Sequence, residues 1–388
     1  MIPLIRKSPA LCVFLCLFLF LIQPRPATAE DITLVPSIDI RGEYDDNVNF
    51  SRVDEKADYF VAVTPAFTFH YDTDVLNLKS KGSVDVLRYL HDSDLNTENY
   101  KFQADGTYRV LERLSLKGDF TYVKDTTLDS QLEETGLLMV RSERERFIGG
   151  AGLTYQMTEK SFLDLEGSRQ KTNYAFRGYV DYTNDSLVLS YNRKFNDGLD
   201  VFTVQPNYSR YDSIVSKVDN YGLSFGLAHQ FSETLNFTGF LGVRYTQTDS
   251  VNTGTDDSFG GVANIKVKKS WEASSLSGGY THDLNYDSTG EPINVDRVFC
   301  SADYKVAARF RLRFSGSFYL TKSEGQFRDK DERYFSLTPS LTYRVTEDSS
   351  VRLAYTYSYS LDEELVDDRV AERNRVWLAY TAEWPMKW

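Results

Sequence analysis

Hydrophobic and polar residues alternate with a period of two over most of the chain after Glu30. The alternation is clearest in residues 59–71, 221–231, 310–320 and 351–359, where aromatic or aliphatic residues hold nearly every second position. This pattern is typical of β-strands with one apolar face, whereas the spacing of amphipathic helices is nearly absent. Each segment is about 9 to 13 residues long, a length that crosses a bilayer at a tilt.

Short and long connections alternate between these segments. Tight turns are expected at Asp72–Asp74, Leu111–Arg113, Thr158–Lys160, Asn196–Gly198, Ser232–Thr234, Trp271–Ala273, Ala307–Ala308 and Glu347–Ser349. Long polar loops are expected at residues 125–145, 248–257, 286–294 and 323–332. Short turns on one side and long loops on the other are typical of outer-membrane barrels, and the count predicts about 18 strands, with 16 or 20 as alternatives.

The polar face of the strands separates a membrane barrel from a soluble sandwich or propeller, which is the alternative fold. A soluble barrel hides its apolar face, but here the non-aromatic positions carry many charged residues. Unpaired charges are very costly in a dry core, whereas a water-filled lumen accepts them. The sequence therefore predicts an all-β fold: a transmembrane, antiparallel, up-and-down outer-membrane β-barrel.

The charges that share the parity of the lumen are more often basic than acidic. The predicted basic set is Lys79, Lys81, Lys101, Arg109, Lys117, Arg244, Lys266, Arg297, Arg311, Arg313, Arg344 and Arg352. The predicted acidic set is Asp85, Asp105, Asp119, Asp164, Glu166 and Asp303. Basic rings favour anionic solutes, so one hypothesis is the passage of an anion or an acidic polymer. The alternative is a ladder of mutually paired charges that stiffens the wall.

The N-terminus has the layout of a secretory signal peptide. Arg6 and Lys7 precede a short apolar run, residues 10–22, and Ala27–Ala29 is a small-x-small cleavage site. We expect a signal peptide over residues 1–29 and a barrel over residues 30–388. Removing three cations changes the formal charge from −12 to −12 − 3 = −15. An acidic exported chain is a poor candidate for binding nucleic acid.

The C-terminal strand carries a second targeting feature. Tyr380, Trp384 and Trp388 share one parity, and the chain ends on the last of these rings. This arrangement resembles the signal by which the barrel assembly machinery recognises its clients, although Trp replaces the usual Phe. Aromatic residues also lie beside the expected tight turns, where rings suit the boundary between lipid and water. These rings are Tyr71, Tyr155, Phe195, Phe231, Trp271, Phe310 and Tyr343.

Candidate catalytic and metal-binding chemistry is sparse. The sequence has no HExxH, GxSxG or paired-cysteine metal motif, so we expect no enzymatic activity, no catalytic residues, no metal and no cofactor. The acidic stretch Asp45-Asp46-Asn47 lacks the spacing of a calcium loop and is expected to turn the chain into the first exposed loop.

Residues 36–90, which contain the stretch YDDNVNF, resemble the start of the beta-barrel porin 2 family. That family opens with a strand, then Tyr-Asp-Asp-Asn-Val, then an Asp-led strand with Thr/Ser-Pro, then a strand that leads to Tyr. The matching elements are Tyr44 to Val48, Asp58 to Pro65 and Leu76 to Tyr89, while Ala66 stands where the family often has Gly. The family includes outer-membrane barrels associated with exopolysaccharide biosynthesis clusters.

The resemblance implies an outer-membrane conduit for exopolysaccharide export in a Gram-negative bacterium. Its implied partners are membrane lipid and lipopolysaccharide, the barrel assembly machinery and periplasmic polysaccharide-export proteins; the sequence leaves the oligomeric state open. The first alternative is a general or anion-selective diffusion porin. The second is a structural or adhesive barrel plugged by its own loops.

Overall fold

The computed structural model describes residues 31–388 except 252–253, 324–329 and 364–368, so the predicted signal peptide lies outside the described residues. The long strands are β1 (Asp31–Asp45), β2 (Asp58–Asp72), β3 (Leu76–Tyr89), β4 (Thr97–Leu111), β5 (Leu114–Thr126), β6 (Glu143–Thr158), β7 (Ser161–Tyr174), β8 (Tyr182–Phe195), β9 (Asp200–Ser213), β10 (Ser216–Ser232), β11 (Leu235–Ser250), β12 (Gly254–Ser270), β13 (Ser274–Tyr286), β14 (Pro292–Lys305), β15 (Phe310–Ser323), β16 (Asp331–Arg344), β17 (Ser349–Asp362) and β18 (Arg369–Glu383). They confirm the predicted count of 18.

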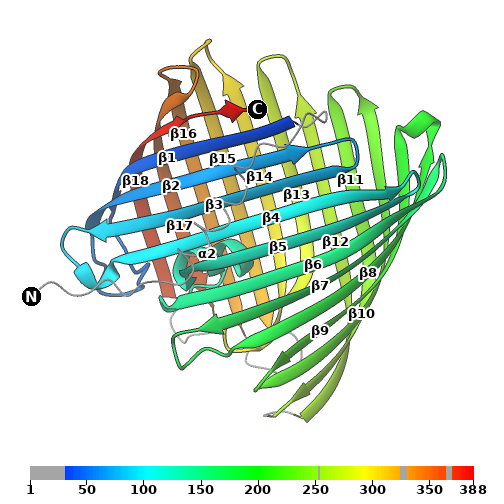
Figure 1. The fold of residues 1–388 in the computed structure, drawn as a ribbon. Helices are drawn as coiled ribbons and strands as arrows, with labels where there is room; N and C mark the ends of the chain where they lie inside the picture. Colours follow the sequence, from blue (N-terminus) through cyan, green and yellow to red (C-terminus); the bar gives the residue numbers. More distant parts are fainter. Residues whose placement is uncertain (1–30, 252–253, 324–329, 364–368) are drawn as a thin grey trace, which may run out of the picture.

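Each strand pairs antiparallel with its neighbours in sequence, and the sheet closes on itself (Figure 1). β1 pairs with β18 from Ser37↔Glu383 to Asp45↔Arg375. Pro385 lies between β18 and a two-residue strand, β19 (Met386–Lys387), which continues the pairing with β1. A strand tolerates a proline here because the lost N–H lies at a strand end.

All eight predicted tight turns connect consecutive strands, as expected. The long loops differ from the prediction. β11 and β12 extend so far that only residues 251–253 connect them, and residues 287–291 fold inward, with Asp287 and Ser288 buried. The connection between β5 and β6 also turns inward and contains the helix α2 (Thr127–Thr135). The predicted loop at 323–332 lies partly outside the described residues.

Apolar and polar side chains lie on opposite faces of the strands, as the alternation predicts. Large apolar side chains such as Leu223, Phe225 and Leu353 are exposed on the outer face, where lipid would cover them. The predicted girdle rings Tyr155 and Trp271 are likewise exposed beside the tight turns. The inner face carries the polar set, so the barrel has an apolar belt outside and a polar interior. No helix in the described ranges is long and apolar enough to cross a membrane.

Among the described residues, the pairing between consecutive strands is shortest between β12 and β13. β12 and β13 pair only from Ala263↔His282 to Ser270↔Ser275, although β12 continues to pair with β11 up to Gly254. Two consecutive glycines, Gly260 and Gly261, lie just beyond the end of this ladder, and Phe259 is 83% exposed. Residues 254–262 of β12 therefore pair with β11 but not with β13.

We expect the amides of residues 259–262 to exchange with deuterium faster than those of residues 263–270 of the same strand. In residues 259–262, an N–H group that points away from β11 has no partner in the described ladder with β13. Local unfolding of these residues therefore breaks fewer hydrogen bonds than unfolding of residues 263–270. The expected difference is about tenfold or more in exchange rate, measured by mass spectrometry. Residues 235–250 of β11 are the internal control. Equal protection along the whole of β12 would contradict a weaker pairing between β12 and β13.

Candidate functional site in the barrel lumen

The inward segment, residues 127–142, contains a short helix with a buried face. Leu128 and Leu132, four residues apart and therefore on one side of α2, are 1% and 2% exposed. They pack in one cluster with Leu137, Tyr319 and Tyr334. Gly136 ends the helix in the left-handed conformation (φ 73°), and a Cβ there would lie 2.5 Å from Cβ of Tyr319. Glycine thus allows both the turn and the close approach.

Hydrogen bonds fix this segment to the far side of the barrel. The Tyr319 hydroxyl donates to the Glu133 carbonyl at 2.6 Å, and Thr321 donates to the carbonyl of Thr135. The Leu138 N–H donates to Glu332 at 3.2 Å. The segment leaves the wall at β5 and β6 and is bound at β15 and β16, nearly half-way around the closed 18-strand barrel. It therefore crosses the lumen and narrows it.

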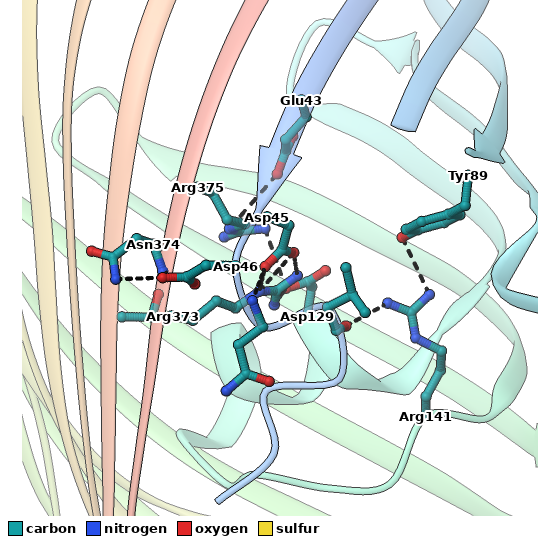
Figure 2. Close-up of polar contacts among 12 residues, drawn as sticks. Glu43, Asp45, Asp46, Tyr89, Asp129, Arg141, Arg373, Asn374 and Arg375 are labelled. Carbon is teal, nitrogen blue, oxygen red and sulfur yellow. Dashed lines mark hydrogen bonds and ion pairs between the residues drawn. The ribbon is translucent and has the colours of Figure 1, made fainter. Parts of the chain in front are cut away.

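Arg373 of β18 is the centre of the polar contacts that hold α2 (Figure 2). Its side chain is 3% exposed and pairs with Asp45 of β1 at 2.5 Å and with Asp129 of α2 at 2.8 Å. Arg375 reaches the same Asp129 carboxylate at 3.4 Å. Further along the segment, the Arg141 guanidinium donates to the carbonyl of Val48 at 3.1 Å. One guanidinium thus joins the barrel closure to the lumen helix.

The stretch YDDNVNF forms the wall side of this junction. Asp45 and Asn47 are fully buried, and the Asn47 side chain donates to the carbonyls of Ser51 and Glu372 at 2.8 and 2.9 Å. Asp46 accepts from the N–H of Asn374 at 2.6 Å. The expectation that residues 45–47 start an exposed loop is wrong. Their polar groups are used to bond the first strand to the last, and a buried polar group must be bonded.

A second buried arginine holds the other side of α2 to the near wall. Arg144 of β6 has a fully buried side chain and pairs with Asp125 and Glu134, each at 2.9 Å. Arg146 contacts the same Glu134 at 2.6 Å. A buried charge is tolerated only when it is paired and hydrogen-bonded, as it is here. The helix is therefore clamped by cations from both walls.

The pKa of the Asp129 carboxyl lies well below its usual range. Desolvation of this half-exposed carboxyl inside the lumen opposes ionisation, but the guanidiniums of Arg373, Arg375 and Arg141 outweigh it. A group with a depressed folded-state pKa contributes stability that is fully present above its unfolded pKa and is lost only as the pH falls through the folded value.

We therefore expect acidification from pH 7 to pH 4 to leave the α2 anchor in place, because Asp129 stays ionised over that range. The Asp129→Asn variant lacks the charge and should therefore lack the ionic anchor of α2 already at pH 7. The wild type should lose this anchor only at a much lower pH. The measurement is single-channel conductance as a function of pH. A wild-type conductance step between pH 5 and pH 4 that Asp129→Asn lacks would contradict the assignment.

The predicted lumen charges all lie at inward positions of their strands, and few of the cations are paired. Lys117 contacts Asp164 at 3.3 Å and Glu166 at 3.7 Å, Arg244 contacts Asp283 at 3.4 Å, and Arg313 contacts Asp303 at 2.9 Å. Among the described residues, the other nine of the twelve predicted cations form no ion pair within 4.0 Å. They are Lys79, Lys81, Lys101, Arg109, Lys266, Arg297, Arg311, Arg344 and Arg352. The wall is therefore not a ladder of paired charges.

The remaining predicted residues take separate positions. Asp85 accepts a hydrogen bond from Thr64 at 2.7 Å, while Asp105 and Asp119 face each other across β4 and β5. Arg109 lies at the rim, where it donates to the carbonyl of Asp74 in the β2–β3 turn. Tyr380, Trp384 and Trp388 are exposed on the outer face near the closure; their role in assembly stays a prediction.

The sequence reading missed the arginines that hold the constriction. Arg373 has the same parity as Arg375 in β18, and Arg144 and Arg146 share the inward parity of β6. The available signals were the i, i+4 leucines and Gly136, which together predict a short helix within 125–145. Among the described residues, no group of three or more His, Cys, Asp or Glu side chains is placed to hold a metal ion.

A closed 18-strand barrel with an apolar outer belt, a charged lumen and an inward constriction defines a protein of the outer-membrane porin class. The family described as putative beta-barrel porin 2 matches this chain at residues 28–198, which confirms the resemblance found in the sequence.

Solved structures with a similar fold include OccK2 (OpdF) of Pseudomonas aeruginosa, with a TM-score of 0.50, 8% identity and coverage of 91% of this chain and 98% of that one. Another is OccAB3 of Acinetobacter baumannii, with a TM-score of 0.47, 12% identity and coverage of 92% and 100%. At these identities the likeness concerns the fold alone. Curated proteins yielded no match.

Proposed function

We propose that this barrel is a diffusion channel of the outer membrane that favours small anionic solutes. The observation that carries the proposal is the set of nine inward-facing cations without an ion-pair partner among the described residues. A cation that is left unpaired beside a water-filled path lowers the energy of a passing anion and raises that of a cation. The acidic side chains of the lumen are fewer, and several of them are already bonded to hydroxyls or to lysine.

The inward segment supports small solutes over a polymer. Residues 127–142 cross the lumen and are bound on both sides, so the path past them is narrower than the barrel. A chain of linked sugars would need this segment to leave its binding sites at each passage. Export of exopolysaccharide, the first expectation from the sequence, therefore has less support than diffusion.

The test is the reversal potential of the purified full-length barrel in a planar bilayer under a KCl gradient. The expected result is a potential of the sign given by chloride preference, together with restored uptake of small anions in a porin-deficient strain. Preference for potassium would overturn the anion selectivity. No conductance at any voltage would instead favour the plugged structural barrel. Loss of secreted polysaccharide on deletion of the gene, without a defect in solute uptake, would favour export.

A further inference from the structure

The strands β14 to β17 bring six cations into one pocket at the end of the barrel that carries the tight turns. The pocket has a volume of about 270 Å³. Its cations come from the ends of the four strands and from the turn between β14 and β15. They are Lys305, Arg309, Arg311, Arg313, Arg344 and Arg352. Three carboxylates, Glu347, Asp348 and Glu383, also line it, so the formal balance is 6 − 3 = +3.

The register explains why these side chains converge. Lys305 lies opposite Arg311, Arg311 opposite Thr342, and Thr342 opposite Arg352. The three cations thus form a row across four adjacent strands, with Arg311 and Arg352 about 10 Å apart at two strand spacings. Arg313 and Arg344 lie one inward position to either side of that row.

Among the described residues, none of the three cations of the row forms an ion pair within 4.0 Å. Of the six, only Arg313 forms an ion pair within 4.0 Å among the described residues, and its partner is Asp303, outside the pocket lining. Ser340, Thr342 and Ser350 add hydroxyls to the lining, and none of the three side chains forms a hydrogen bond within the part of the chain that the structure describes. Guanidiniums and free hydroxyls are the groups that bind carboxylate and phosphate oxygens.

We infer that this pocket is a binding site for a small anion with two or more negative groups, such as a di- or tricarboxylate or an organic phosphate. This inference rests on the proposed function, because the site can take part in transport only if anions pass through the barrel. A single charge can meet only one or two of these cations, whereas a polyvalent anion bridges the row. The volume suits a metabolite of a few carbons and is too small for a polymer segment of several sugars.

The site is separate from the constriction. Arg352 lies opposite Ala379 in β18, and Arg373 is six residues further along that strand, about 20 Å away. A solute that has passed α2 therefore meets the pocket at the opposite, turn-bearing end. The lumen thus holds two groups of arginines at different depths. The arginines around α2 pair with acids of α2 and of the wall, whereas most of those in the pocket form no ion pair among the described residues.

The test is isothermal titration of the full-length barrel in detergent with citrate as the probe and acetate as the monovalent comparison. The expected result is saturable citrate binding that the double variant R311A/R352A weakens at least tenfold, with acetate weak in both. The matched control is K79A/K81A, which removes two inward cations of β3 outside the pocket and should bind citrate as the wild type does. Resistance of each variant to unfolding in cold detergent confirms that the barrel is formed.

Three outcomes would overturn the site: no saturable citrate binding, equal affinity in R311A/R352A, or an equal loss in K79A/K81A. The last would mean a diffuse field of the whole wall. The proposed function is judged separately by the wild-type reversal potential. Chloride preference without citrate binding would support the anion-selective channel and contradict the binding site. Citrate binding with potassium preference would support the binding site and contradict the anion-selective channel.

Discussion

Replacing Arg373 by alanine is expected to raise the single-channel conductance at least twofold. Arg373 contacts both the barrel closure, through Asp45 at 2.5 Å, and the lumen helix, through Asp129 at 2.8 Å. Arg375 makes the same two connections at longer distances, to Glu43 at 3.8 Å and to Asp129 at 3.4 Å. Removing Arg373 leaves the fully buried Asp45 carboxylate without its cation, and breaking a buried pair in this way costs about 3–5 kcal/mol. The segment 127–142 then loses its strongest contact with β18 and is free to move aside.

The control is Arg169→Ala, which removes an arginine from an exposed pair with Asp185 at 2.7 Å. An exposed pair contributes about 0–1 kcal/mol, and this one lies on the outer face, so the conductance should not change. If Arg373→Ala fails to assemble, the double variant Arg373→Met with Asp45→Asn removes both charges and avoids the orphaned carboxylate. A folded variant of either kind with wild-type conductance would show that Arg373 does not hold the constriction.

The strands and turns could be predicted because each strand must present apolar residues to lipid at every second position. In β10, for example, Tyr221, Leu223, Phe225 and Leu227 are all exposed on the outer face, and the pattern fixes both the length and the register of the strand. The tight turns follow from where this alternation stops. The closure of β1 on β18 then follows from the even number of strands.

The lumen could be predicted only in part. The alternation along the strands places Arg311 and Arg352 on the inner face. It does not show whether a cation forms an ion pair, because that depends on which acidic side chains of neighbouring strands lie close enough. The segment 127–142 is predicted to be a polar loop because its apolar residues do not alternate as those of the strands do. Its partners, such as Tyr319 and Val295, lie in strands far away in sequence. The local signal of Leu128, Leu132 and Gly136 indicates a short helix, but the position of that helix in the lumen depends on these distant contacts.

The stretch YDDNVNF shows the same limit at single residues. Two aspartates and an asparagine between aromatic residues indicate an exposed turn, because polar residues in a turn are normally solvated. Here Asp45 meets Arg373, and Asp46 meets Asn374, more than three hundred residues away. The stretch thus bonds the first strand of the barrel to the last strand. It also forms part of the wall to which α2 is bound.

Reversing the charge of two pocket arginines, Arg311→Glu with Arg352→Glu, is expected to convert chloride preference into potassium preference. The change is four charge units on one wall. At about 10 Å through water each unit contributes roughly 0.4 kcal/mol to the energy of a passing ion, so four contribute about 1.7 kcal/mol, or more than tenfold in the permeability ratio. Salt screens this interaction, so the effect should be largest at or below about 0.1 M KCl and shrink towards 1 M.

The measurement is the reversal potential in a tenfold KCl gradient, repeated at low and high mean salt. The matched control reverses Lys79 and Lys81 of β3, which also lack an ion pair among the described residues but lie outside the pocket. It should shift the potential less if ions pass close to β14–β17. Equal shifts in both variants would mean that permeating ions sample the whole wall. No shift in either would mean that the selectivity is set elsewhere, most directly at the arginines around α2.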